Sequence, residues 1–303
     1  MNFRVAVIGR TGRGNYGHGL DVVWKQFPAP RVQVVAVADE DEAGGRKAAE
    51  RLGVRAVYRD YREMLRQERP DVVSIAPRWV DAHHDMVLAA AEARASMYLE
   101  KPMARSLAEA DAMLAACERA HVKLAIAHQM RLAPNVLRAR ELLAAGEIGD
   151  LLEMRARGKE DRRAGGEDLM VLGTHVMDLM RLFAGDPLWT LAHVAEGPAD
   201  LARAHVRDGA EGLGPLAGAN IAAMYLYPRG VHGFFSSRKS EDESGTRFGL
   251  DLLGSRGLIA LRAGMDPEIH LFRSRSLAPA QGAEWTRVTA PGYERPAGDA
   301  FQV

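Results

Sequence analysis

A Glu-Lys-Pro tripeptide is the feature of this sequence with the clearest chemical potential. Glu100, Lys101 and Pro102 follow a short apolar run, Ser96–Leu99. Pro102 restricts the backbone of Lys101 to extended conformations, which fixes the direction of the lysine side chain. An ammonium group held there can hydrogen-bond a hydroxyl and stabilise a developing alkoxide, while Glu100 can bind a hydroxyl or orient the lysine. On a solvated surface the same tripeptide would carry no chemistry.

A histidine in the second half of the chain is the other candidate for chemistry. At about 100° per residue, one helical face carries Leu169, Leu172, Val176, Leu179, Met180 and Phe183, and another carries Asp168, Val171, His175 and Asp178. His175 thus lies off the apolar face, with acids three residues later and seven residues earlier. That arrangement suits a general base whose imidazole is oriented by a carboxylate. A surface His–Asp pair without chemistry is the alternative.

A glycine-rich loop near the start has the composition of a phosphate-binding turn. It runs from Gly9 to Gly17 and contains a G-x-G-x-x-G pattern at Gly12, Gly14 and Gly17. Glycines permit a tight turn and a close approach of the backbone to a pyrophosphate. Counting from Gly9 puts Thr11 where the second glycine belongs, so we interpret the segment as a lengthened phosphate loop. A glycine-rich surface turn is the alternative.

An acidic residue follows this loop at the spacing expected for a ribose contact. Asp39 lies 22 residues after Gly17, near the roughly 20 residues typical of dinucleotide-binding folds. The acidic run from Asp39 to Glu42 would repel a 2′-phosphate, which favours NAD over NADP. Arg10 and Arg13 weaken this preference because either could reach a phosphate, so NADP stays the alternative cofactor.

The first half of the chain alternates apolar runs with helical stretches. The runs predict strands over residues 3–8, 33–38, 56–58, 71–76, 96–99 and 123–127, and helices over 17–27, 42–52, 82–94 and 107–120. Ser106 and Glu109 match a capping box at the start of the last helix. Strands separated by helices predict a parallel sheet. Lys101 then lies at the carboxyl end of a strand, where such sheets bind ligands.

The pattern changes after about residue 128. It predicts helices over 134–145 and 168–184, and strands over 188–194, 220–227, 231–237, 248–253 and 258–261. Pro228–Gly230 and Gly254–Gly257 predict turns between strands. We therefore expect an α/β chain: a doubly wound parallel sheet in domain 1–127, and an α+β domain 128–303 with a large, mostly antiparallel open sheet. The tail from about Leu277, rich in Pro, Gly and Ala, is expected to be irregular.

Bulk composition excludes several classes of protein. The 303 residues exceed most single cores, which favours two domains. Lys+Arg and Asp+Glu are both 40, a balance that argues against a nucleic-acid or membrane-surface role. The sequence shows no secretory signal, no long apolar span and a single cysteine, Cys117. We expect a cytoplasmic protein and no metal site.

With these residues identified, the chain resembles the glucose–fructose oxidoreductase / inositol dehydrogenase family (Gfo/Idh/MocA) over nearly its whole length. The matching segments are the strand-and-glycine start, Val37-Ala38-Asp39, Ile75-Ala76-Pro77 with His83, Glu100-Lys101-Pro102, Gln129–Pro134 and Gly165–Asp178. The resemblance implies a Rossmann domain followed by an α/β domain whose open sheet often builds dimers or tetramers. It also implies oxidation or reduction of a sugar, polyol or related alcohol with a nicotinamide cofactor.

The resemblance further implies roles for individual residues. It makes Lys101 and His175 catalytic and places them, with Arg131, at the substrate. The cofactor-binding residues expected from it and from the glycine loop are Gly9, Thr11, Gly12, Arg13, Gly14, Asp39, Pro77, His83, Glu100, Lys101 and Gln129. Residues 159–163 either line the substrate pocket or form a solvated loop.

Two departures from the family pattern stand out. The usual aspartate four residues before the histidine is Val171 here, which cannot accept a hydrogen bond. Asp168, one turn earlier, is the candidate to replace it as a catalytic acid. Family members also carry another helix after the segment that resembles Pro296–Asp299, so the chain is expected to be short at that end.

The expected reaction is hydride transfer between a carbinol carbon and nicotinamide C4. His175 would remove the hydroxyl proton and Lys101 would stabilise the oxygen. One alternative, motivated by Val171, is a lyase or glycosidase-type enzyme that uses tightly bound NAD for transient oxidation. Another is a non-catalytic nucleotide-binding protein. The expected partners are a small-molecule substrate and further copies of the chain, joined through the C-terminal sheet as a homodimer or homotetramer.

Overall fold

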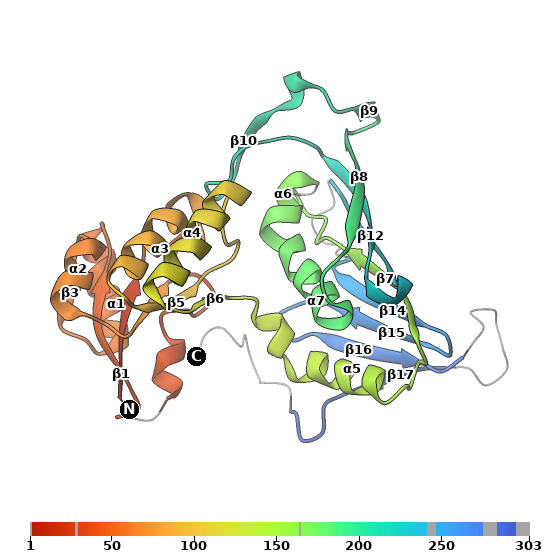
Figure 1. The fold of residues 1–303 in the computed structure, drawn as a ribbon, viewed down its shortest axis with the longest axis horizontal. Helices are drawn as coiled ribbons and strands as arrows, with labels where there is room; N and C mark the ends of the chain where they lie inside the picture. The colour runs from red at the N-terminus through yellow and green to blue at the C-terminus, as the bar shows by residue number, and fades with distance from the viewer. Residues whose placement is uncertain (1, 28–29, 164, 241–246, 275–283, 295–303) are drawn as a thin grey trace. The chain divides into compact units, whose positions relative to one another are not determined.

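The computed structural model describes residues 2–27, 30–163, 165–240, 247–274 and 284–294 (Figure 1). These residues divide into two compact units. One unit extends to Ala127 and also takes in Gly209–Gly214. The other comprises His128–Asp208 and the described residues from Pro215 onwards. The Pro296–Asp299 segment, after which a further helix was expected, lies outside the described residues.

A parallel sheet forms the centre of the first unit. Its strands are β1 (Phe3–Ile8), β2 (Val32–Ala38), β3 (Ala56–Tyr58), β4 (Val72–Ile75), β5 (Ser96–Leu99) and β6 (Leu124–Ile126). They are arranged β3-β2-β1-β4-β5-β6, with every neighbouring pair parallel. This is the strand order of a Rossmann fold, so the predicted doubly wound sheet is confirmed. The carboxyl ends of all these strands therefore meet at one edge.

Helices cover both faces of this sheet. They are α1 (Glu42–Leu52), α2 (Tyr61–Glu68), α3 (His83–Glu92) and α4 (Leu107–Ala120), with a short 3₁₀ turn, η2 (Val80–Ala82), before α3. Met64, Met86 and Met113 bring α2, α3 and α4 into one core, while Ala48 and Leu52 of α1 pack on the opposite face. Burial on both faces explains why the strands are continuous apolar runs. The sequence prediction omitted α2.

The predicted helix over residues 17–27 is wrong. The chain forms turns there, followed by a single 3₁₀ turn, η1 (Val23–Gln26). His18 and Gly19 have φ values of +43° and +75°, in the left-handed region that a right-handed helix cannot contain. The carbonyl of Leu20 accepts a hydrogen bond from the Ser74 hydroxyl at 2.6 Å. Among the described residues, no α-helix therefore lies between the glycine loop and β2.

The second unit is built on a nine-stranded sheet. Its strands are β7 (Leu151–Arg157), β8 (Trp189–Glu196), β9 (Ala199–Asp200), β12 (Asn220–Leu226), β13 (His232–Arg238), β14 (Gly249–Gly254), β15 (Leu258–Arg262), β16 (Glu268–Phe272) and β17 (Trp285–Val288). The order is β17-β16-β15-β14-β7-β13-β12-β8-β9. Neighbours are antiparallel except β13 and β7. The predicted large, mostly antiparallel sheet is confirmed.

Four strands of this sheet differ from the sequence prediction. β7, β9 and β16 were not predicted, and β17 lies in the tail that was expected to be irregular. The remainder of that tail, residues 277–283 and 295–303, lies outside the described residues. The turns at Pro228–Gly230 (η6) and Gly254–Gly257 connect adjacent strands as predicted. The strands β10 (Arg207–Gly209) and β11 (Gly214–Leu216) form a separate two-stranded sheet, and η5 (Arg203–His205) precedes them.

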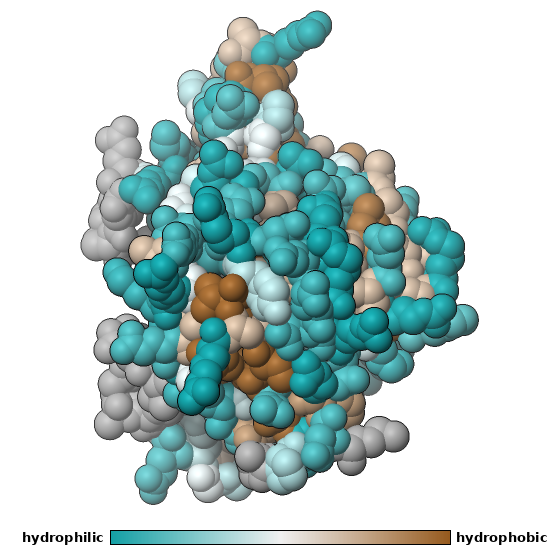
Figure 2. Space-filling model, turned by 90° about the vertical axis from the view of Figure 1, so that its left-hand side faces the viewer, coloured by the Kyte–Doolittle hydropathy of each residue, from teal (hydrophilic) through white to brown (hydrophobic). Residues whose placement is uncertain are grey.

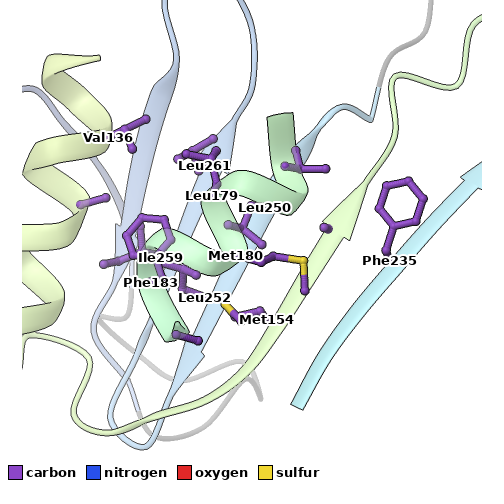
Figure 3. Close-up of a cluster of buried hydrophobic side chains, with 14 of the residues drawn as sticks. Val136, Met154, Leu179, Met180, Phe183, Phe235, Leu250, Leu252, Ile259 and Leu261 are labelled. Carbon is purple, nitrogen blue, oxygen red and sulfur yellow. The ribbon is translucent and has the colours of Figure 1, made fainter. Parts of the chain in front are cut away.

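The helices of the second unit bury one face of its sheet. They are η3 (Gln129–Leu132), α5 (Pro134–Ala144), α6 (Gly166–Asp168), the π turn η4 (Leu169–Gly173) and α7 (Thr174–Ala184). α7 contacts β7 and β14, and α5 contacts β16. Figure 3 shows Leu179 and Met180 of α7 directed at Met154 and Leu250 of the strands, which are fully buried. This apolar layer fixes the position of the helix that carries His175.

Hydrophilic side chains predominate on the face drawn in Figure 2, where apolar residues gather in small patches. Over the part of the chain that the structure describes, every helix is too short or too polar to cross a bilayer.

Removing a core side chain should weaken the second unit more than removing an exposed one. Leu250 is fully buried in β14, so Leu250→Ala should lower the free energy of unfolding by about 2–5 kcal/mol. The matched control is Leu188→Ala, at a leucine that is 65% exposed, and its effect should stay within about 0.5 kcal/mol. Urea unfolding followed by circular dichroism measures both. Equal effects would contradict the assigned core.

Candidate active site

The carboxyl edge of the parallel sheet gathers most of the predicted cofactor residues. Gly9 follows β1, Asp39 follows β2, Pro77 lies just beyond β4, and Glu100 and Lys101 follow β5. Asp39, Glu100 and Lys101 are buried there although each is ionisable. Buried charges need partners, so the contacts of these three side chains define what this edge can do.

Glu100 lies between two nitrogen bases. Its Oε1 is 2.7 Å from Nδ1 of His18 and 3.9 Å from Nζ of Lys101. Its Oε2 is buried and, within the described chain, has no hydrogen-bond partner. The carboxylate is therefore within ion-pair distance of the lysine and keeps one oxygen available to accept from a hydroxyl. Sequence reasoning missed His18, which it placed inside a predicted helix over residues 17–27.

His83 connects the two loops that flank Lys101. Its Nε2 is 2.7 Å from the carbonyl oxygen of Pro77 and its Nδ1 is 2.9 Å from that of Pro102. Burial lowers the pKa of His83, although both carbonyls and the charge of Glu100 act in the opposite direction. Because His83 is fully buried and engaged with backbone on both sides, it supports the Lys101 loop. Its predicted contact with a cofactor stays a prediction.

Asp39 is engaged by the glycine loop itself. Its carboxylate accepts from the Thr11 amide at 3.1 Å, the Thr11 hydroxyl at 2.7 Å, the Tyr16 hydroxyl at 2.9 Å and the Asp41 amide at 3.0 Å. These donors occupy about all the acceptor positions that a carboxylate offers. Asp39 lies where a ribose-binding acid should lie, but its oxygens are directed into the loop.

Gly9 and Gly14 of this loop are required by the chain's own packing. A Cβ on Gly9 would lie 2.0 Å from the Tyr16 ring. A Cβ on Gly14 would lie 2.5 Å from the backbone nitrogen of Trp79, and Gly14 has φ +90°. Gly12, Thr11 and Arg13 are exposed. Arg10, a candidate for phosphate contact, instead pairs with Asp81 at 2.8 Å.

In the second unit, His175 lies on α7, directly after a π turn that interrupts the α-helical period. The π turn Leu169–Gly173 inserts extra backbone between α6 and α7. Val171 and Asp168 are consequently buried, while Leu169 and Leu172 are partly exposed. Leu169 and Leu172 of the predicted apolar face pack against the core, but Val171 and Asp168 of the other face are buried as well, because the helix does not keep one α-helical period throughout. π turns often occur at functional sites.

His175 has a second imidazole beside it. The rings of His128 and His175 are 5.5 Å apart and nearly perpendicular, and Nε2 of His128 lies 3.5 Å from the Thr174 hydroxyl. The sequence offered one signal for His128, its position directly after the last predicted strand of the first domain. The side chain of Gln129, its neighbour, has a buried Oε1 that lacks a hydrogen-bond partner among the described residues.

The acids expected to orient His175 have other partners. Asp178 accepts a hydrogen bond from Arg131 at 2.9 Å, and this ion pair joins η3 to α7. Arg131, which was predicted to bind substrate, is therefore paired with Asp178. Asp168 accepts from the Ser237 hydroxyl at 2.6 Å and the Glu160 amide at 3.3 Å. Burial raises the pKa of both carboxyl groups. Both acids therefore anchor neighbouring segments of the second unit.

The charged side chains of residues 159–163 form ion pairs within this segment and with Arg247. Asp161 lies 2.8 Å from Arg163 and 3.6 Å from Lys159. Burial acts to raise the pKa of Asp161, but these hydrogen bonds and charges lower it to about 2. Glu160 pairs with Arg247 at 2.6 Å and accepts from the Arg238 amide. Among the described residues, no cluster of three or more His, Cys, Asp or Glu could hold a metal ion.

Comparison with known proteins agrees with this fold. Residues 3–128 match the family model GFO_IDH_MocA, described as an oxidoreductase family with an NAD-binding Rossmann fold. The chain is 35% identical to D-apiose dehydrogenase of Paraburkholderia graminis over 51% of its length, and 32% identical to D-xylose 1-dehydrogenase (NADP(+)) 2 of Haloferax volcanii over 57%. These alignments cover 44% and 56% of the two relatives, so the chain spans about half of each.

A solved structure extends the likeness over both units. Levoglucosan dehydrogenase in complex with NADH and levoglucosan has a TM-score of 0.75 and 21% sequence identity. The match covers 95% of this chain and 80% of that one, and it shows a shared fold. Residues 3–128, which contain the parallel sheet and Glu100-Lys101-Pro102 described above, are thus similar to the Gfo/Idh/MocA oxidoreductase family.

Proposed function

We propose that this protein is an NAD(P)-dependent oxidoreductase that acts on a CH–OH group of a sugar, polyol or related small molecule. Residues 1–127 would form the cofactor domain and residues 128–303 the substrate and oligomerisation domain. The observation that carries the proposal is the Glu100–Lys101 pair, buried at the carboxyl edge of a Rossmann sheet. The dehydrogenase relatives support it, since two of them are named for aldopentose substrates, D-apiose and D-xylose.

The proposed chemistry assigns separate roles to Lys101 and His175. Lys101 would donate a hydrogen bond to the substrate oxygen and stabilise the charge that develops on it. His175, with His128 beside its ring, would accept the hydroxyl proton. Arg131 would lie near the substrate while it holds Asp178. A bound nicotinamide supplies the hydride acceptor or donor.

Several residues fit a nicotinamide cofactor. The buried Oε2 of Glu100 and the buried Oε1 of Gln129 are suited to a hydroxyl or amide donor. His83, through the carbonyls of Pro77 and Pro102, supports the loop that carries Lys101. The residues expected at the adenosine end of the cofactor fit less well. The carboxylate of Asp39 already accepts from Thr11, Tyr16 and the Asp41 amide, and the glycine loop leads into turns and not into a helix. We assign the loop residues Gly9, Thr11, Gly12, Arg13 and Gly14 to the cofactor as part of the proposal.

NAD is the proposed cofactor, with NADP as the alternative. The acids Asp39 to Glu42 disfavour a 2′-phosphate. Arg10, which could have reached such a phosphate, is paired with Asp81. Arg13 is exposed and remains available to a phosphate, and the Haloferax relative is named for NADP.

The second candidate function rests on Val171. This residue is 1% exposed and apolar, where the family pattern has an aspartate. The absence of that carboxylate motivates the alternative of transient oxidation by tightly held NAD, followed by elimination or glycosidic cleavage and return of the hydride. Product analysis separates the two functions, since the lyase or glycosidase gives no net NADH. A non-catalytic nucleotide-binding protein would bind cofactor and turn over nothing.

We propose that the protein forms a homodimer or homotetramer through its large sheet. The face away from the helices has an apolar hollow of about 560 Å³ lined by Leu191, Met224, Phe234 and the stems of Arg155 and Arg157. Leu191 is 66% exposed, and Trp189 on the same strand is 45% exposed. Exposed apolar surface of this kind marks an interface. The proposed compartment is the cytoplasm, which agrees with the buried free thiol of Cys117.

Lys101→Ala should abolish turnover and leave NAD affinity largely intact, because the lysine acts on the substrate oxygen. Lys101→Met, which keeps the volume of the buried stem, should behave in the same way. Enzyme assays and titration of NADH fluorescence measure the two quantities, with the exposed Lys47→Ala as the matched control. Unchanged turnover in either Lys101 variant would remove the lysine from the mechanism.

His175→Gln should lower kcat by about 10²-fold or more, since glutamine retains hydrogen bonding but cannot serve as a base. The substrate KM should change much less. His232→Gln, at an exposed histidine of the same unit, is the control. A loss confined to KM would assign His175 to binding and contradict its proposed role as base.

Leu191→Asp should dissociate the oligomer, because it places a charge in the apolar hollow of the sheet face. Analytical ultracentrifugation of the wild type and variant at several concentrations measures this. Leu188→Asp, just outside the strand, is the control. A wild type that sediments as a monomer at every concentration would refute the proposed interface.

A further inference from the structure

The acid that should recognise an adenosine ribose is saturated by the protein. Four donors reach Asp39, and three of them, the Thr11 amide, the Thr11 hydroxyl and the Tyr16 hydroxyl, belong to the glycine loop. Asp39 is 2% exposed. A carboxylate offers about four acceptor positions. A ribose hydroxyl can therefore reach Asp39 once a loop donor has left.

Tyr16 is held in this position by contacts with Gly9, Arg51 and Asp39. Its ring fills the space beside Gly9, where a Cβ would be 2.0 Å from the ring. The Arg51 guanidinium lies over the same ring, 5.2 Å from its centre, and is itself fixed by Asp21. Burial and the charge of Asp39 raise the pKa of Tyr16, so its hydroxyl stays protonated and donates at neutral pH.

Thr11, which also donates to Asp39, packs against the start of α1. A Cβ on Gly44, in the first turn of α1, would lie 2.0 Å from the Thr11 hydroxyl. Thr11 thus lies between Asp39 and the start of α1. The backbone of Gly9 and the acid after β2 are the two features that a dinucleotide uses in such folds. The Tyr16 ring covers Gly9, and the hydroxyls of Tyr16 and Thr11 both donate to Asp39.

We propose that Thr11 and Tyr16 are affinity-determining residues that compete with the adenosine ribose of a dinucleotide for Asp39. This inference rests on the proposed nicotinamide-dependent function and concerns the adenosine half of the cofactor alone. Binding requires the Tyr16 hydroxyl to release Asp39 as the ribose hydroxyl replaces it. The number of hydrogen bonds on the acid is then the same in the free and bound protein, so Asp39 contributes little net affinity.

The test removes the competing hydroxyl and keeps the ring. Tyr16→Phe retains the packing on Gly9 and below Arg51 but frees one acceptor position on Asp39. Calorimetric titration with ADP-ribose should show affinity raised about tenfold, the value of a hydrogen bond to a charged group. Thr11→Val should act in the same direction. The affinity for nicotinamide mononucleotide, which lacks the adenosine, should be unchanged.

Tyr58→Phe is the matched control, because Tyr58 also donates to a carboxylate, that of Glu68, at 2.8 Å in the same unit. It should leave both affinities unchanged. Equal or weaker binding of ADP-ribose by Tyr16→Phe, with wild-type binding intact, would overturn this inference and leave the proposed function standing. A wild type and variants that bind neither ADP-ribose nor NAD would overturn both.

Discussion

The buried carboxylate of Glu100 is the constraint on which the proposed site depends. A charge removed from water is tolerated when cationic groups and hydrogen bonds compensate for it. His18, directly after the glycine loop, and Lys101, directly after Glu100, provide this compensation. Glu100 thus favours a cationic group such as the Lys101 ammonium at the carboxyl edge of the sheet. His83 reinforces this arrangement because its ring lies within hydrogen-bond distance of the Pro77 carbonyl after β4 and the Pro102 carbonyl after Lys101.

The parallel sheet could be predicted because its strands are buried on both faces. Phe3–Ile8 and Val32–Ala38 are continuous apolar runs, and such runs separated by helical stretches leave few other folds. β7 was missed although Leu152, Met154 and Ala156 alternate with charged residues, the pattern of a half-buried strand. α2 was missed because two buried residues, Met64 and Leu65, hardly define a helical period.

The site could be predicted where it depends on local sequence and not where it depends on distant partners. Glu100 and Lys101 were recognised because they follow a strand. The pairing of His18 with Glu100 joins residues 82 positions apart, and that of Arg131 with Asp178 joins residues 47 apart. The π turn before His175 likewise left no periodic signal, since its effect is to break the period. Asp39 was placed correctly, but its saturation by Thr11 and Tyr16 depends on the folded loop.

The central proposal is that the protein oxidises or reduces a CH–OH group with a nicotinamide cofactor, with Lys101 and His175 as its catalytic residues. The most direct measurement is the absorbance of reduced nicotinamide when the wild-type protein is mixed with NAD and a panel of sugars, polyols and their phosphates. The account predicts stoichiometric formation of NADH and a ketone or lactone product with at least one class of these compounds. A protein that binds NAD but forms no reduced cofactor with any of them would contradict it.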